Sequence, residues 1–353
     1  MIKQELYGKT KDGEEVTLYR LKNKNGMEAD FIDFGANLVN LYVPDKNGKI
    51  TDVVLGYDNL EGYLVNPPSM GSFVGRNANR IAGAQVILNN KTYELEKNNG
   101  ENNLHSSSVG YNKHMYETEI FEEEDSISIE FSRLSPDMEQ GFPGNLDLTV
   151  TYTLTDENEL VIEYLAVSDK DTVVNFTNHS YFNLAGHNSG LVLDHKVYIN
   201  ADRFTITNDD MIPTGELVDV TGTPMDFRTL KSIGQDFNAD YKPLIQGNGY
   251  DHNYVLNTAG EDVGKVAELF EEKSGRLMEV FTDLPGLQFY TSNFLETYPG
   301  LKNKDGATYT KRSGVCFETQ LFPNACNNSN FRSSVLKAGQ EYDFVTVYKF
   351  STK

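Results

Sequence analysis

Short runs of alternating apolar and polar residues, separated by turns, constrain the fold of this chain more than any other feature. The clearest run covers residues 146–154, where threonines and one aspartate lie between apolar side chains. Alternate side chains of a β-strand point to opposite faces of a sheet, so the run predicts a strand with one buried face. The apolar residues of this run are Leu146, Leu148, Val150, Tyr152 and Leu154.

The N-terminal part of the chain repeats this pattern. Strand-like runs at 16–21, 27–32 and 38–43 alternate with turn sequences at 23–26 and 44–48, and both turns end in Asn-Gly. Asn-Gly is typical of tight hairpin turns, because both residues adopt positive φ angles easily. This part of the chain therefore predicts consecutive antiparallel strands.

Helical signals are few and short. One follows Asp58 and another lies between 229 and 236, whereas residues 267–282 predict a hairpin that turns at 273–276. No βαβ alternation, internal repeat or linker-like segment divides the chain. We therefore predict an all-β fold with one domain over residues 1–353, a large and mostly antiparallel β-sandwich with few short helices.

The charge balance excludes one class of partner. The chain has 31 lysines and arginines against 52 aspartates and glutamates, which gives a formal net charge of -21. It has no basic block that would neutralise the phosphates of a nucleic acid, so we expect no nucleic acid as a partner. The negative field also opposes strongly anionic substrates and favours a neutral ligand.

Hydropathy and cysteine content bear on the cellular compartment of the protein. The first residues are charged throughout, and no run of about 18 apolar residues follows, so we expect no membrane segment. Cys316 and Cys326 are the only cysteines in the sequence, too few for a disulfide framework. These features predict a cytoplasmic protein and leave open whether it is a monomer or a homodimer.

Hydrogen-bonding and aromatic side chains crowd the segment 175–184, Asn-Phe-Thr-Asn-His-Ser-Tyr-Phe-Asn-Leu. It follows a strand-like run at 160–174, so we expect His179 at or near a strand end. A histidine with an ordinary pKa of about 6.5 both gives and takes protons near neutral pH, which suits proton transfer to a neutral, hydroxylated ligand. A structural histidine held in a turn explains this segment equally well.

Two other polar segments lie at turns between strand-like runs, where functional side chains often gather. In 75–83, Asn79 and Arg80 are suited to hydrogen-bond sugar hydroxyls, although an arginine in a loop more often binds backbone carbonyls. In 98–106, His105 either positions a ligand or is simply solvated. Neither segment is decisive by itself.

Two strand-like segments carry acidic residues. In 249–256, Asp251 directly precedes His252, and strand alternation sends the two side chains to opposite faces. We assign Asp251 to the pocket. In 314–320, Glu318 has apolar or uncharged neighbours, and a glutamate there is costly to bury unless it is paired.

A metal site is one alternative for these residues. Two histidines and one carboxylate form a common ligand set for transition metals. The sequence has no HExxH motif and no cysteine–histidine cluster, so we expect neither a metal nor another cofactor. The residues that could form such a set are His105, His179, His252, Asp251 and Glu318.

Taken in order, these segments resemble those of the aldose 1-epimerase (galactose mutarotase) family. Each motif is weak, but six motifs in the same order over nearly the whole chain are specific. The motifs are GRNANRIAG, NNLH, NFTNHSYFNL, GYDHNYVL, PGLQFYTSNF, and FETQ with its continuation Pro323-Asn324-Ala325.

The resemblance implies a β-sandwich with a sugar groove and an enzyme without a cofactor that interconverts the α- and β-anomers of free hexoses such as galactose and glucose. It implies Glu318 as the general base, His179 as the general acid and His105 as a second histidine of the site. The sugar contacts that it implies are Asn79, Arg80, Tyr181, Asp251 and Gln288.

This chain departs from the family pattern at three places. Ser106 and Ser107 follow His105, where the family commonly has two glycines. Tyr116 stands where the family carries a tryptophan, and the proline often found near Arg332 is missing. The departures concern the loop that carries His105, and with it the sugar preference. The positions of the acid and the base match.

The implied roles also predict a pH dependence. If Glu318 is ionised and His179 is protonated in the productive form, their attraction lowers the pKa of Glu318, raises that of His179 and broadens the active pH range. Two alternatives remain from the sequence alone. A carbohydrate-binding protein needs no such pair, and a glycoside hydrolase would use two carboxylates, here Asp251 and Glu318.

Overall fold

Nearly all regular structure in this protein is β-strand. The computed structural model describes residues 1–258 and 262–353. Within those ranges, neighbouring strands of the main sheets pair antiparallel, as the runs and turns predicted. The strand expected at 146–154 is present at Leu146–Thr155, and its apolar face is the buried one.

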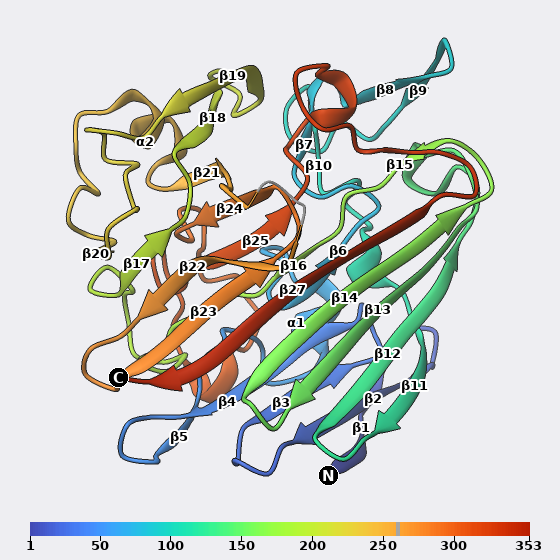
Figure 1. The fold of residues 1–353 in the computed structure, drawn as a ribbon. Coiled ribbons are helices and arrows are strands. Elements are labelled where there is room, and N and C mark those ends of the chain that lie inside the picture. Colours follow the sequence, from blue (N-terminus) through green and yellow to red (C-terminus); the bar gives the residue numbers. More distant parts are fainter. Residues whose placement is uncertain (259–261) are drawn as a thin grey trace.

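The largest sheet of the described part spans the molecule (Figure 1). In spatial order it contains β11 (Glu117–Glu122), β12 (Ser126–Ser135), β13 (Leu146–Thr155), β14 (Glu159–Ser168), β27 (Glu341–Thr352), β23 (Arg276–Thr282), β22 (Gly264–Phe270), β17 (Lys196–Ile199) and β20 (Lys231–Ser232). The C-terminal strand β27 lies between β14 and β23, so it joins hairpins that are far apart in the sequence.

A second sheet is built from the N-terminal hairpins in sequence order. Its strands are β1 (Ile2–Lys9), β2 (Glu15–Lys22), β3 (Glu28–Ile32), β4 (Asn37–Pro44) and β5 (Ile50–Asp52). Figure 1 shows the blue strands β1, β2 and β3 behind the green strands of the largest sheet. The rings of Phe31 and Tyr152 lie 4.5 Å apart between their centroids, so the two sheets pack face to face.

A third sheet carries several of the candidate site residues. Its strands in spatial order are β19 (Pro213–Asp219), β18 (Arg203–Thr207), β21 (Asp251–Val255), β24 (Gly286–Tyr290) and β25 (Cys316–Gln320). The Tyr348 hydroxyl on β27 donates to the Phe317 carbonyl on β25 at 2.8 Å, which links this sheet to the largest one.

The hydrophobic core lies between the largest sheet and the two smaller ones. One cluster of buried side chains includes Phe31, Tyr152 and Phe317, one from each sheet. Full burial of a large apolar side chain contributes about 1.5–3 kcal/mol, so the facing sheets stabilise one another. The architecture is the predicted β-sandwich.

Short ladders and helices connect the sheets. The ladders are β6 (Ser72–Val74) with β16 (Thr177–His179), β7 (Arg80–Ile81) with β10 (Asn103–Leu104), β8 (Gln85–Leu88) with β9 (Lys91–Glu94), and β15 (Thr172–Val173) with β26 (Val335–Leu336). The helices are α1 (Leu60–Val65), α2 (Lys242–Gly247) and the 3₁₀ turns Ala82–Ala84, Tyr111–Lys113, Glu139–Gly141, Lys304–Gly306 and Ala325–Asn327. No helix within the described ranges is long and apolar enough to cross a membrane.

Two local predictions are wrong. The stretch 229–236 contributes to β20 instead of a helix, and α2 follows later, with Pro243 in its first turn and Asn248 at a φ of 53° as its C-cap. Those are the usual start and stop signals of a helix. The run at 160–174 is interrupted after Ser168, because exposed polar residues turn the chain before β15 begins.

Candidate active site

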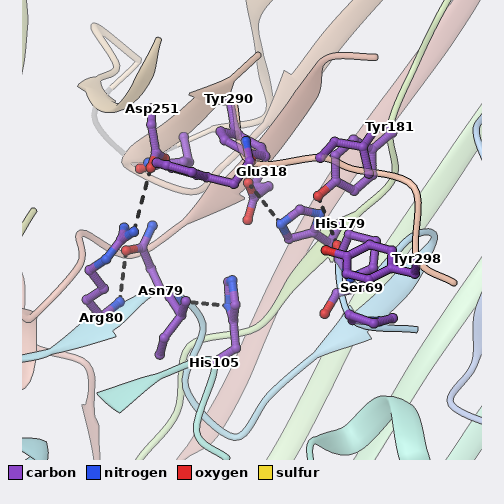
Figure 2. Close-up of a pocket in the computed structure, with 16 residues that line it drawn as sticks. Ser69, Asn79, Arg80, His105, His179, Tyr181, Asp251, Tyr290, Tyr298 and Glu318 are labelled. Carbon is purple, nitrogen blue, oxygen red and sulfur yellow. Dashed lines mark hydrogen bonds and ion pairs between the residues drawn. The ribbon is translucent and has the colours of Figure 1, made fainter. Parts of the chain in front are cut away.

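The residues predicted from the sequence meet in one pocket (Figure 2). They come from strands and turns that are far apart in the chain, including β7, β16, β21, β24 and β25. The structure therefore brings together the whole predicted set. Its members are Asn79, Arg80, His105, His179, Tyr181, Asp251, Gln288 and Glu318.

Strand register in the third sheet places the acidic residues. Gln288 lies opposite Glu318 in the pairing of β24 with β25, and Asp251 begins β21 opposite Tyr290. Residues two apart on a strand share a face, so Gln288 and Tyr290 point to the same side. Asp251 lines the pocket, and His252 is buried without lining it. The expectation that Asp251 reaches the pocket and His252 does not is confirmed.

Glu318 and His179 face each other in the middle of this pocket (Figure 2). Glu318 Oε1 lies 3.6 Å from His179 Nε2, and the two side chains are 3% and 7% exposed. The second oxygen, Glu318 Oε2, is buried and has no hydrogen-bond partner among the described residues. A buried carboxylate oxygen without a partner is costly, which marks it as an acceptor for a ligand.

Burial sets the proton affinities of this pair. It raises the pKa of Glu318 well above its usual value, an effect that Asp251 reinforces and Arg80 opposes. Burial also lowers the pKa of His179 to about 4, against smaller raising effects that include Asp251. The expectation that mutual attraction lowers the pKa of Glu318 and raises that of His179 is therefore wrong. Each group loses more by leaving water than it gains from its partner.

Asn79 fixes the proton position on His105. The Asn79 backbone N–H donates to His105 Nδ1 at 3.1 Å, and the His105 backbone N–H donates to the Asn79 carbonyl at 3.1 Å. Because Nδ1 accepts a hydrogen bond, the neutral ring carries its proton on Nε2. Burial and then His179 lower the pKa of His105 well below its usual value. His105 is therefore a neutral N–H donor.

The cluster of histidines and glutamate does not fit a metal ion. Ligand atoms of His105, His179 and Glu318 lie within 4.8 Å of one another, and His252 and Asp251 do not belong to this group. A metal-bound histidine normally donates its second ring N–H to an acceptor. The second nitrogen of His105 instead accepts a backbone N–H, so a metal on Nε2 would require a ring without any proton.

Asp251 anchors a polar wall beside the acid–base pair. Gln288 Nε2 donates to Asp251 Oδ1 at 2.6 Å, and Arg80 Nη2 lies 3.6 Å from Asp251 Oδ2. Arg80 Nε also donates to Asn99 Oδ1 at 3.4 Å. Both Asp251 oxygens thus face donors, and the guanidinium of Arg80 is held at the pocket (Figure 2).

Tyr181 supports a loop that the sequence did not indicate as part of the site. Its ring centroid lies 5.0 Å from that of His179, and its hydroxyl donates to the Pro68 carbonyl at 2.9 Å. Tyr290 had a usable signal, because it follows Gln288 by two positions and shares its face. The lining residues that sequence reasoning missed are Pro67, Pro68, Ser69, Leu104, Tyr290, Phe294, Leu295 and Tyr298.

Comparison with known sequences identifies one family. The family model described as Aldose 1-epimerase matches residues 17–349. A galactose mutarotase from Bos taurus is 45% identical over 328 residues, which is 92% of this chain and 91% of that protein. An aldose 1-epimerase from Haemophilus influenzae is 37% identical and is matched over 96% of this chain and 97% of its own length.

Solved structures show the same architecture. The galactose 1-epimerase from Lactobacillus acidophilus superposes with a TM-score of 0.87 at 26% identity, covering 100% of this chain and 99% of that chain. An aldose epimerase homologue from C. elegans superposes with a TM-score of 0.85 at 32% identity, covering 95% and 98%. Sequence, fold and the motifs of the pocket agree, and the chain belongs to the aldose 1-epimerase family.

Proposed function

We propose that this protein is an aldose 1-epimerase that interconverts the α- and β-anomers of free hexoses such as galactose and glucose. The observation that carries the proposal is the acid–base pair. Glu318 presents a buried oxygen without a partner among the described residues, and its other oxygen lies 3.6 Å from His179. The names of the relatives, galactose mutarotase and aldose 1-epimerase, support the same reaction.

Mutarotation needs two proton transfers at one end of the sugar. Glu318 takes the proton of the C1 hydroxyl while His179 donates a proton to the ring oxygen, and the C1–O5 bond breaks to give the open aldehyde. After rotation about C1–C2, the bond re-forms on the opposite face as both protons return. No proton or electron is gained or lost overall. A positioned acid or base typically contributes ~10²- to 10⁴-fold in rate.

Burial strengthens both groups for these tasks. The raised pKa of Glu318 makes its carboxylate a better base, and the lowered pKa of His179 makes its imidazolium a better acid. When the pair holds a single proton, that proton therefore favours Glu318 over His179. In the reactive form this proton is on His179, and Glu318 is ionised. The pair as a whole therefore sets the pH dependence.

The other polar groups of the pocket hold the sugar in this proposal. The Nε2–H of His105 and the guanidinium of Arg80 donate to oxygens on which charge develops, because fixed donors cost little reorganisation. The partners of the remaining hydroxyls are Asn79, Tyr181, Asp251 and Gln288. A neutral hexose also suits a chain with a net charge of -21.

Polarimetry of freshly dissolved α-D-galactose and α-D-glucose tests the proposal. We expect the optical rotation to reach its equilibrium value faster, in proportion to the protein concentration. Saturable sugar binding without faster mutarotation would instead show a carbohydrate-binding protein. Release of reducing sugar from an aryl galactoside would show a glycoside hydrolase, which we do not expect because Gln288 and Arg80 already engage both oxygens of Asp251.

A further inference from the structure

One strand contacts both nitrogens of the His179 ring. Cys316 and Glu318 lie two positions apart on β25 and therefore share a face. Cys316 Sγ lies 3.7 Å from His179 Nδ1, and Glu318 Oε1 lies 3.6 Å from His179 Nε2. Both β25 residues are buried, Cys316 completely. The mechanism above uses the Nε2 side of the ring and leaves the contact at Nδ1 unexplained.

The Cys316 side chain stays a thiol in this position. Burial raises its pKa well above the usual value, and the nearby Glu318 and Asp251 reinforce the rise. A thiol is a weak hydrogen-bond donor and a weak acceptor. When protonated His179 gives its Nε2–H to the sugar ring oxygen, the neutral ring that remains carries its proton on Nδ1, and this N–H faces the sulfur of Cys316.

We propose that Cys316 is a positioning residue that accepts a weak hydrogen bond from the Nδ1–H of His179, so that Nε2 faces the pocket and gives its proton to the sugar ring oxygen. The proposal rests on the mutarotase function proposed above. It gives the strand β25 two roles: Glu318 supplies the base, and Cys316 fixes the orientation of the acid.

Sulfur at Nδ1 also keeps the imidazolium acidic. Cys316 Sγ lies beside the Nδ1–H of protonated His179, and sulfur accepts a hydrogen bond weakly, whereas a carboxylate there would stabilise the cation. Burial lowers the pKa of His179 and outweighs both a hydrogen bond with its own backbone and the effect of Asp251, which raise it. The titratable and charged groups around the ring are Cys316 and Glu318 on β25, Tyr290 on β24, Asp251 on β21, and Tyr181 and His105 on the neighbouring turns.

Two substitutions separate hydrogen bonding from packing. Cys316→Val fills the space of the thiol without a hydrogen bond, and Cys316→Ser keeps a donor and acceptor in a smaller side chain. We expect Cys316→Val to lower kcat about tenfold with little change in KM, the loss expected for one hydrogen bond. Cys316→Ser should retain kcat within about threefold and raise the pKa of His179, because oxygen accepts the Nδ1–H better than sulfur. Cys326→Ser is the matched control and should change neither value.

Histidine ring NMR of the sugar-free protein tests the contact independently of activity, with the signal of His179 assigned through His179→Gln. We expect the Nδ1–H tautomer for the neutral ring in the unmodified protein and a mixture of tautomers in Cys316→Val. The proposal is overturned if the neutral ring of the unmodified protein carries its proton on Nε2, or if Cys316→Val keeps the normal tautomer and kcat. If the unmodified protein fails to accelerate mutarotation, the proposed function fails, while the tautomer measurement still decides the contact.

Discussion

Burial shifts the proton affinities of Glu318 and His179 in opposite directions. A glutamate normally titrates at about 4.3 and a histidine at about 6.5. In the pocket, burial raises the pKa of Glu318 well above its usual value and lowers that of His179 to about 4. Each shift disfavours the charged form in the resting pocket and makes that form more reactive once a sugar selects it.

The pH profile of kcat/KM should therefore be bell-shaped. His179 sets its acid limb and Glu318 its alkaline limb, the reverse of the order expected from their ordinary pKa values. The rate falls as pH drops through about 4, where His179 gains a proton while Glu318 still holds its own. It also falls as pH rises through the raised pKa of Glu318, where the pair loses its only proton. Initial rates by polarimetry over the acid and alkaline range measure both limbs.

The variant His179→Gln tests which residue's titration causes each limb of the pH profile. With the imidazole gone, the acid limb of His179 disappears and the small residual rate should increase with pH through the raised pKa of Glu318, because only the carboxylate is a base. A residual rate that already reaches its plateau just above the ordinary glutamate value of about 4.3 would show that Glu318 is not shifted. Near-normal activity in this variant, together with loss in His105→Gln, would reverse the assignment of the acid.

Chelation should leave the rate unchanged. The backbone N–H of Asn79 occupies Nδ1 of His105, so this ring has no free nitrogen for a metal while its Nε2 is protonated. Dialysis against EDTA followed by polarimetry measures the effect, with buffer-dialysed protein as the control. Loss of activity that one added divalent ion restores would contradict the tautomer and make the cluster a metal site.

At the scale of strands, most of the correct sequence-based predictions came from the alternation of side chains between the two faces of a strand. It placed Glu318 inside a strand, separated Asp251 from His252, and identified the buried face of β13. The rim was not predictable in this way, because Pro67, Ser69 and their neighbours lie in loops without a repeating pattern. The pKa shifts were missed for another reason: their direction depends on depth of burial, which one sequence does not encode locally.

The ladder of β21, β24 and β25 predicts a coupling between neighbouring strands. Gln288 donates to Asp251 at 2.6 Å, so we expect it to act on the sugar partly through that carboxylate. Gln288→Leu should raise KM about tenfold with a smaller effect on kcat, as loss of a hydrogen bond to a charged group would. The double variant with Asp251→Asn should be no worse than Asp251→Asn alone, whereas fully additive effects would show that Gln288 acts independently.

At the scale of the whole molecule, the site lies where segments from distant parts of the sandwich meet. Arg276 on β23 helps to hold them together, because its buried guanidinium donates to three backbone carbonyls. Its Nε, Nη1 and Nη2 lie 3.1, 2.8 and 3.0 Å from the carbonyl oxygens of Val43, Leu184 and Lys49, respectively. The segment that follows His179 is thereby tied to both the largest and the N-terminal sheet.

Arg276→Met should lower the free energy of unfolding by about 3 kcal/mol, since buried carbonyls lose their partners. Urea denaturation measures this change, and kcat per folded molecule should stay the same. Arg228→Met is the control, because Arg228 forms its ion pairs with Asp226 and Asp202 at the surface and should cost at most about 1 kcal/mol. Equal losses in the two variants would contradict the role of Arg276 as a buried tie.

The rate of mutarotation by Glu318→Gln tests the central claim most directly. Glutamine keeps the shape of the side chain and removes the proton acceptor, so the fold should persist, with a melting temperature at neutral pH no lower than that of the unmodified protein. Polarimetry of α-D-galactose should show kcat reduced at least ~10²-fold, the contribution of one positioned base. A folded Glu318→Gln protein that retains kcat within a few-fold would contradict the assignment of Glu318 as the base.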